Sequence, residues 1–185
     1  MMDIWKIKLY GFFFLFFIGS QTGFTQKYYT RTGVTEFKAS LDAFEPIEAT
    51  NKITSVILNG KGEIAAQLFI GAFAFKIALM QEHFNENYMD ADKFPKATFK
   101  GRIESFDIES LKKKFKLRGD LSIKGMTKEV STEIEIQKVN QRTLLLKGEF
   151  MVSPNDFNIK IPRIVRNKIA DKVKIILNYE LSKKK

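Results

Sequence analysis

The stretch FKLRGDLSIK, residues 115–124, alternates strictly between apolar and polar positions. Phe115, Leu117, Gly119, Leu121 and Ile123 share one face, and charged or hydroxyl side chains occupy the other. Successive side chains of a β-strand point to opposite faces, so this period is typical of a strand with one buried and one wet face. The stretch therefore predicts a strand at the edge of an apolar interior.

The same alternation recurs through most of the chain after residue 26. It is found in residues 37–41, 97–103, 130–136, 144–152 and 173–181. Residues 53–58 lead into Asn59-Gly60-Lys61-Gly62, which predicts a hairpin turn. Residues 64–75 are apolar on both faces, which predicts a strand that is covered on its outer side as well.

These segments predict an all-β domain of about eight or nine strands. They lack the long spacing of βαβ units, so the sheet is expected to be antiparallel. Closure into an extended barrel removes the exposed edges of such a sheet, and an eight-stranded barrel can hold one small ligand. A β-sandwich is the competing architecture. Gly101, Gly119 and Gly148 lie on the apolar faces, where they permit strand bending or leave space for something inside.

One segment, near residues 76–89, has a helical period instead. Ile77, Met80, Phe84 and Tyr88 recur at spacings of three, four and four, which predicts one apolar face of a short α-helix. Inserted between barrel strands, this helix is expected to close one mouth, with its apolar face toward the interior. The alternative is an ordinary packing helix without ligand contact.

Residues 1–25 resemble a cleavable signal peptide. Lys6 and Lys8 precede a short apolar run, residues 9–18, and then a small, polar segment. We expect cleavage after Thr25, a single domain over residues 26–185, and a periplasmic or secreted location. An uncleaved membrane anchor is the alternative.

The charge balance is strongly basic, with a formal net charge of +10 for the full chain. Residues 26–185 keep 29 basic and 20 acidic residues, a net charge of +9. For an exported protein this favours transient contact with an anionic membrane surface, or a phosphorylated ligand, over nucleic acid. A soluble surface that is merely rich in lysine explains the charge equally well.

Catalytic and metal-binding patterns are weak. His83 is the only histidine and the chain has no cysteine, so a zinc site lacks ligands. Asp90 and Asp92 resemble the start of a calcium loop, but Phe94 occupies the third ligand position. No nucleophile-elbow motif is present. The sequence therefore predicts no catalytic residue, no metal and no cofactor.

Several motifs together resemble the YceI-like family of polyisoprenoid-binding proteins. They are EHFNENYM (82–89), KFPKATFKG (93–101), the pattern Gly119-x-Leu-x-Ile-x-Gly-x-Thr-Lys-x-Val130, DFNI (156–159) and IADKV (169–173). The resemblance covers most of residues 27–182, in the order of the family's motifs.

The resemblance implies a lipocalin-like barrel whose apolar lumen holds a long isoprenoid chain, either a polyprenyl phosphate or a quinone-type lipid. It also implies an exported protein without a catalytic motif. The inward positions expected to touch the lipid, each of which is also a plausible core residue, are Phe37, Phe75, Met80, Phe84, Phe99, Ile103, Leu117, Leu121, Ile134, Leu146, Phe150 and Ile175.

Two other functions remain open from the sequence. One is an interaction or stress module with a packed barrel and a basic surface, and the other is an enzyme acting on a lipid inside the barrel. The strands supply almost no titratable groups on their inward faces, which disfavours the enzyme. The sequence does not fix the oligomeric state, and a homodimer is one option.

Overall fold

The structure is a computed structural model that describes residues 26–40, 46–166 and 169–184. The predicted signal peptide, residues 1–25, lies outside the described residues. The strands are β1 (Lys27–Ser40), β2 (Glu48–Asn59), β3 (Glu63–Phe69), β4 (Ala74–Phe75), β5 (Lys96–Ile103), β6 (Phe115–Ile123), β7 (Met126–Asn140), β8 (Thr143–Val152) and β9 (Ile169–Lys183). The helical segments are α1 (Ala78–His83), η1 (Ile70–Ala72), η2 (Phe84–Met89), η3 (Pro154–Phe157) and η4 (Arg163–Val165).

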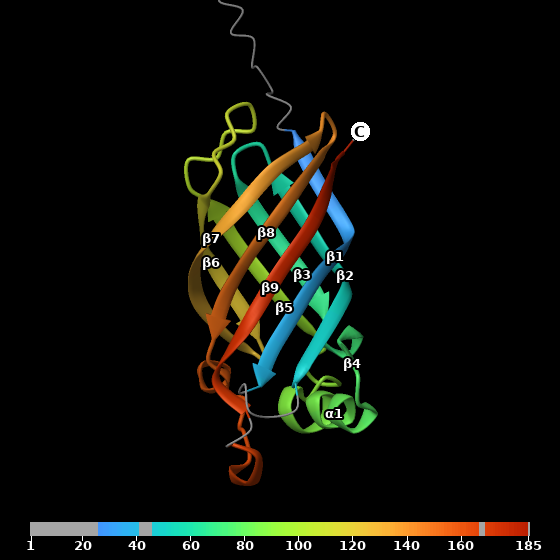
Figure 1. Cartoon of the computed structure of the whole chain (residues 1–185). Helices are drawn as coiled ribbons and strands as arrows, with labels where there is room; N and C mark the ends of the chain where they lie inside the picture. Colours follow the sequence, from blue (N-terminus) through green and yellow to red (C-terminus); the bar gives the residue numbers. More distant parts are fainter. Residues whose placement is uncertain (1–25, 41–45, 167–168, 185) are drawn as a thin grey trace, which may run out of the picture.

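The strands form one closed antiparallel barrel (Figure 1). The order around the sheet is β1-β9-β8-β7-β6-β5-β3-β2, and pairing of β1 with β2 closes the circle. The short strand β4 pairs with β2 outside this circle. The predicted all-β antiparallel barrel is confirmed, and the sandwich is excluded because no free edge separates two sheets.

The single strand predicted over residues 64–75 is wrong. β3 ends at Phe69, and η1 turns the chain before β4 resumes. The amide of Ile70 donates to the carbonyl of Pro95, 2.9 Å away, so the ladder with β5 ends there. The outer side is also not covered by another element, because Phe69 is 45% exposed. Only the Lys96 ammonium, among the contacts of the described residues, lies over its ring, 5.2 Å from the ring centre.

The predicted helix is confirmed. α1 and the π-helical segment η2 together run over residues 78–89 and lie across one end of the barrel, called the helix end below (Figure 1). Asp90, in the left-handed conformation, ends the segment. In the described part of the chain, no helix has the length and apolar character needed to cross a membrane.

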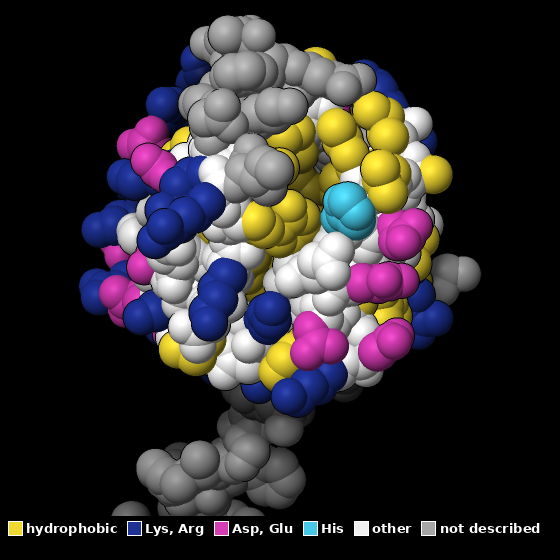
Figure 2. All heavy atoms as spheres, turned by 90° about the horizontal axis from the view of Figure 1, so that it is seen from below, with side chains coloured by type: hydrophobic (Ala, Val, Ile, Leu, Met, Phe, Trp, Pro, Cys, Tyr) yellow, Lys and Arg dark blue, Asp and Glu magenta, His cyan; other side chains and the backbone are white. Residues whose placement is uncertain are grey.

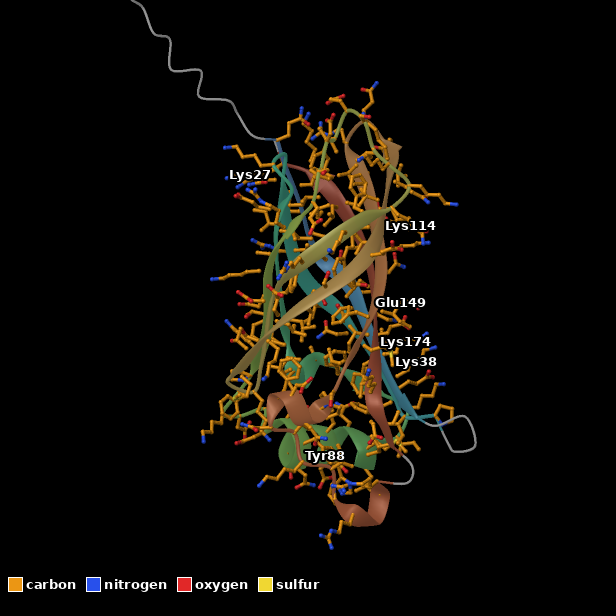
Figure 3. All side chains as sticks on the ribbon, turned by 90° about the vertical axis from the view of Figure 1, so that its left-hand side faces the viewer. Lys27, Lys38, Tyr88, Lys114, Glu149 and Lys174 are labelled. Atoms are coloured by element: carbon orange, nitrogen blue, oxygen red, sulfur yellow. The ribbon has the colours of Figure 1, made fainter. Side chains whose placement is uncertain are left out.

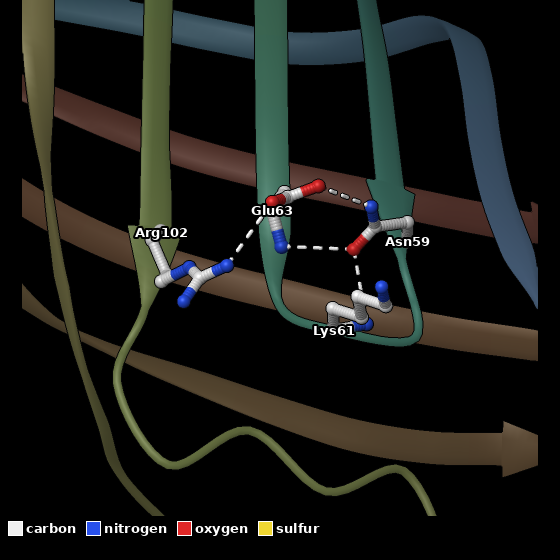
Figure 4. A network of polar contacts seen from close by, with 4 residues as sticks. All are labelled: Asn59, Lys61, Glu63 and Arg102. Carbon is white, nitrogen blue, oxygen red and sulfur yellow. Dashed lines mark hydrogen bonds and ion pairs between the residues drawn. The ribbon is translucent and has the colours of Figure 1, made fainter. Parts of the chain in front are cut away.

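The predicted hairpin at residues 59–62 joins β2 to β3 (Figure 4). The side-chain oxygen of Asn59 accepts hydrogen bonds from the amides of Lys61 and Glu63, both at 3.0 Å. Arg102 of the neighbouring strand donates to the Glu63 carboxylate at 3.0 Å. Gly62 has a φ of +79°, which suits glycine and fixes the tight turn.

The opposite end, called the closed end below, is packed solid by side chains. Its core includes Tyr28, Leu58, Leu144 and Leu181, none more than 2% exposed. The loop over residues 104–114 covers this core with partly buried apolar side chains, Phe106 among them. Such packing fills the barrel interior at this end, so interior space for a ligand lies toward the helix end.

The inward glycines do not leave empty space. A Cβ on Gly101 or on its partner Gly119 would lie 2.6 Å and 2.8 Å, respectively, from the tip of the Phe99 ring. A Cβ on Gly148 would lie 2.7 Å from a methyl group of Ile134. The protein's own side chains therefore fill the volume that these glycines provide.

The outer face of the barrel carries charged pairs between neighbouring strands. Glu149 and Lys174 form one of them, 3.5 Å apart, and Arg118 and Glu129 form another at 2.8 Å. Figure 3 shows the first pair on the outer surface, well away from Tyr88 at the helix end. Exposed pairs of this type contribute little to stability, so the barrel depends on its inward faces.

Candidate functional site

A cavity of about 560 Å³ fills the half of the barrel toward the helix end. Figure 2 looks onto this end and shows a hollow with hydrophobic side chains inside it, basic side chains on one side and acidic side chains on the other. The volume lies within the range of about 300–1,000 Å³ that is usual for small-molecule sites. Among the described residues, the lining is almost entirely apolar and contains no Lys, Arg, Asp or Glu.

The structure places most of the predicted lipid-contacting residues around this cavity. Those that line it are Phe37, Phe75, Met80, Phe84, Phe99, Leu117, Leu121, Leu146, Phe150 and Ile175. Ile103 and Ile134 do not line it, because both are packed in the core of the closed end and are only 1% exposed. Contact of the lining residues with a lipid stays a prediction.

Phenylalanine rings hold the helical segment over the cavity. The Phe84 ring of η2 lies 5.2 Å from the ring of Phe37 on β1, 5.7 Å from Phe73 and 5.1 Å from Phe75 of β4. Such aromatic pairs stabilise packing beyond their buried area. Ile77, Met80, Phe84 and Tyr88 all line the cavity, so the predicted apolar face of the helix does point inward.

The turn between β6 and β7 secures the C-terminal end of the same segment. The Lys124 ammonium donates a hydrogen bond to the carbonyl of Tyr88 at 2.7 Å. The Phe94 ring packs close to Gly125, where an added Cβ would lie 3.1 Å from it. The helical cover is therefore held at Phe84 by aromatic packing and at Tyr88 by a charge-assisted hydrogen bond.

Sequence reasoning missed a second part of the lining, the segment that follows β8. Pro154 and Phe157 of η3 are buried, and both line the cavity together with Ile159, Ile161 and Val165. These residues lie outside the alternating strands, and so their inward orientation had no periodic signal. The apolar spacing of Ile159, Ile161 and Val165 among basic residues was the only available indication.

A cluster of hydroxyl groups was missed as well. Thr35 Oγ1 lies 2.8 Å from Thr54 Oγ1 and 2.9 Å from the Tyr179 hydroxyl. The three residues, on adjacent strands β1, β2 and β9, are at most 4% exposed and line the cavity. Burial raises the pKa of Tyr179 to about 12, and the hydrogen bond with Thr35 lowers it in part. The phenol is therefore a neutral hydrogen-bond donor at physiological pH.

This pKa predicts a loss of stability at high pH. The phenol ionises near pH 10 in the unfolded chain and near pH 12 in the folded chain. The contribution of the neutral Tyr179 phenol to the free energy of unfolding is complete below pH 10. It is lost as the pH rises toward 12, because in this range the unfolded chain releases the phenol proton and the folded chain keeps it. Between these values the free energy of unfolding should fall by up to about 1.4 kcal/mol per pH unit more than in Tyr179→Phe.

Denaturant titrations of both proteins from pH 9 to pH 12 measure this difference. The two proteins have every other titratable group in common, so only the difference between the two slopes reports on Tyr179. Parallel curves for the two proteins would contradict a buried, neutral phenol.

The site offers little for catalysis or metal binding. Within the described residues, no group of three or more His, Cys, Asp or Glu side chains could hold a metal ion. The polar side chains in the lining are hydroxyls, the amide of Gln67 and the imidazole of His83. His83 is itself exposed, and so it lies where the cavity meets solvent. This arrangement suits binding of an apolar molecule.

Solved structures share this barrel. BcnA of Burkholderia cenocepacia has a TM-score of 0.69 at 19% identity, with 80% of this chain and 96% of that chain covered. A polyisoprenoid-binding domain from Saccharophagus degradans has a TM-score of 0.71 at 11% identity, covering 86% and 99%. The YceI protein of Campylobacter jejuni has a TM-score of 0.64 at 17% identity, covering 77% and 87%. At these identities the likeness shows the fold alone.

Comparison with curated proteins found no match. A family model described as the YceI-like domain matches residues 17–181, which is most of the chain. The match includes the nine described strands apart from the last residues of β9, and all the described residues that line the cavity.

Proposed function

Because this chain belongs to the YceI-like family, we propose that it binds a long isoprenoid chain in its barrel cavity, as a carrier or store of the lipid. The observation that carries this proposal is the apolar cavity of about 560 Å³ beneath the helical cover. The barrel of S. degradans, which has the same fold, is described as a polyisoprenoid-binding domain. The lipid is a polyprenyl phosphate or a quinone-type lipid.

The driving force for binding is the removal of hydrocarbon from water. Each buried methylene group contributes roughly 0.8 kcal/mol, so a few isoprene units supply several kcal/mol. Ordering the flexible chain and losing its free motion offset part of this. Because nearly all of the lining is apolar, we expect the length and width of the cavity to select the chain.

Export to the periplasm or the exterior is part of this proposal, and its support is the signal-like segment of residues 1–25. Transient contact with an anionic membrane would let the lipid pass between bilayer and cavity. The basic residues Lys160, Arg163 and Arg166 support such contact, because they alternate with cavity-lining residues in the segment after η3.

We propose a binding role without catalysis. In the described part of the chain, the lining has no carboxylate, lysine or arginine, and its one imidazole is exposed. General acid–base catalysis requires a positioned group of suitable pKa beside the reacting atom. The open volume of the cavity also weighs against a module with a fully packed barrel.

Native mass spectrometry tests the proposal directly. The full chain is produced in an exporting bacterial host and purified without detergent. We expect a discrete added mass that organic solvent releases and that is identified as an isoprenoid. A bare protein mass from a host rich in such lipids, with no uptake of added polyprenyl lipid, would contradict lipid carriage and favour an interaction module.

A further inference from the structure

The barrel wall has an unpaired seam between β7 and β8. The ladder of these two strands ends at the pair formed by Ile134 and Gly148. Beyond it, residues 126–132 of β7 pair with β6 and residues 150–152 of β8 pair with β9, but not with one another. Alternate residues of each strand there direct N–H and C=O groups toward the seam, beyond the end of the ladder. The circle of strands is therefore closed at Ile134 and splits toward the helix end.

A single side-chain hydrogen bond bridges the two strands where the seam begins. Thr132 Oγ1 donates to the carbonyl of Glu149 at 2.6 Å. The same hydroxyl lies 3.4 Å from the carbonyl of Glu133, so its one proton favours the shorter bond to β8. Among the described residues, no other side-chain hydrogen bond or ion pair joins β7 to β8.

The seam borders the cavity. The inward side chains of its two edges line the cavity, and they are Val130, Thr132, Phe150 and Val152. Because side chains alternate along a strand, Ser131 and Met151 point outward and are exposed. A molecule that crosses the wall at the seam therefore meets a mainly apolar margin.

The helical turn η3 plugs the seam. It follows β8 directly and lies beside β7 and β9, and its buried residues Pro154 and Phe157 line the cavity. In the described part of the chain, every hydrogen bond of residues 153–159 stays within that segment. Apolar packing, which is not directional, therefore seats the plug.

The helical cover, which bounds the cavity at the same end, is fastened more firmly. The Phe84 ring packs against three other rings, and the Lys124 ammonium binds the carbonyl of Tyr88. Lifting the cover breaks this aromatic cluster and a charge-assisted bond, whereas opening the seam breaks one neutral hydrogen bond and displaces an apolar plug. Segments held by few hydrogen bonds are the ones that open locally.

We propose that the seam between β7 and β8 is a lateral portal, through which an isoprenoid chain enters and leaves the cavity when the η3 plug moves aside. A gap along the wall lets a long chain pass sideways, whereas passage under the cover requires the chain to thread lengthwise. During passage the hydrocarbon contacts Phe150 and Val152 instead of water. This inference rests on the proposed function and adds the route of lipid exchange.

All-trans-retinol, a fluorescent isoprenoid alcohol, is the probe. Stopped-flow fluorescence follows its uptake by the full chain, made in an exporting host and stripped of lipid, and its release to phosphatidylcholine vesicles. Thr132→Val keeps the side-chain shape but removes the bond to Glu149, so uptake and release should both become about five-fold faster. The Kd should stay within about two-fold of wild type, because easier opening speeds both directions equally.

Two further hydrogen-bond deletions are the controls. Thr127→Val is the same substitution on the same strand, but it removes the 2.7 Å bond with Ser122, where the ladder between β6 and β7 is complete. Lys124→Met removes the bond that holds the helical cover at Tyr88. Both variants should exchange retinol at the wild-type rate if the seam, and not the cover, is the portal.

A cross-link tests the same portal in the opposite direction. Continuing the ladder register places Ser131 opposite Met151, and the chain has no cysteine of its own. In the double variant Ser131→Cys and Met151→Cys, a short bis-maleimide ties the two edges together on the outer face. Retinol added afterwards should enter about ten-fold more slowly or less, and retinol loaded beforehand should be retained. The same variant without the cross-linker should behave as wild type.

Two results would overturn the portal. One is a cross-linked protein that exchanges retinol as fast as the untreated variant, which decides the question even if Thr132→Val does not fold. The other is faster exchange in Lys124→Met with no change in Thr132→Val, which would assign the route to the cover. In both cases the protein still binds an isoprenoid, so the proposed function stands. If the wild-type chain takes up neither retinol nor polyprenyl lipid, the portal and the proposed function both fail.

Discussion

Phe150→Asp should reduce the isoprenoid that co-purifies with the protein by about ten-fold or more, whereas Met151→Asp should leave it unchanged. Phe150 lines the cavity and pairs with Ile175 across β8 and β9. Loss of the ring removes roughly 1.5–3 kcal/mol of apolar contact, and a carboxylate in this apolar wall must be desolvated or neutralised. Because a factor of ten corresponds to about 1.4 kcal/mol, the two effects together exceed it.

Met151 is the matched control because it is the next residue on the same strand and points outward. It is 50% exposed and pairs with Lys174 on β9, so an aspartate there meets water and a positive charge. The measurement is native mass spectrometry with extraction of the bound lipid, on folded protein checked by circular dichroism. Equal lipid content in folded Phe150→Asp and wild-type protein would place the lipid outside the barrel.

Gly119→Ala should destabilise the barrel strongly. The added Cβ would contact the carbonyl oxygen of Lys100 and the Cα of Gly101 at less than van der Waals distance, and it would lie 2.8 Å from the Phe99 ring. Two of these neighbours are backbone atoms of the adjacent strand, which cannot rotate away. Overpacking of this kind costs about 3 kcal/mol, which lowers the Tm by about 10 °C in a domain of this size.

Gly71→Ala is the control for the loss of glycine flexibility. Gly71 lies in η1, and an added Cβ there has no atom within 4 Å, so its stability should stay within about 0.5 kcal/mol of wild type. Thermal unfolding of the two variants, followed by circular dichroism, measures the difference. A Tm for Gly119→Ala equal to that of Gly71→Ala would show that β5 and β6 can separate to accept the methyl group.

Local sequence pattern was sufficient for most of the fold. The alternation in residues 115–124 identifies a strand and its inward face, because side-chain direction in a strand depends only on the period of two. The turn at residues 59–62 and the helical stripe from Ile77 to Tyr88 are local signals of the same kind. The apolar, inward-pointing positions of the alternating strands also supply most residues of the cavity lining, because the period of two fixes which side chains point inward.

Local pattern was insufficient where the chain leaves a regular period. Residues 64–75 are uniformly apolar, which a strand, a turn and a second strand satisfy equally well, and the hydrogen bond from Ile70 to Pro95 decides the break. Phe157 lines the cavity from a short helical turn, where no repeat marks an inward position.

The sequence by itself therefore determined most of the strands and their inward faces, the helical cover and the apolar character of the interior. Only the tertiary structure decided where the interior is packed and where it is open. Ile103 and Leu121 are both inward and apolar, yet the first is core and the second lines the cavity. The tertiary structure also assembled the hydroxyls of Thr35, Thr54 and Tyr179. The physical reason is that cavity volume and hydrogen bonding depend on side chains from strands far apart in the sequence, and barrel closure alone brings these together.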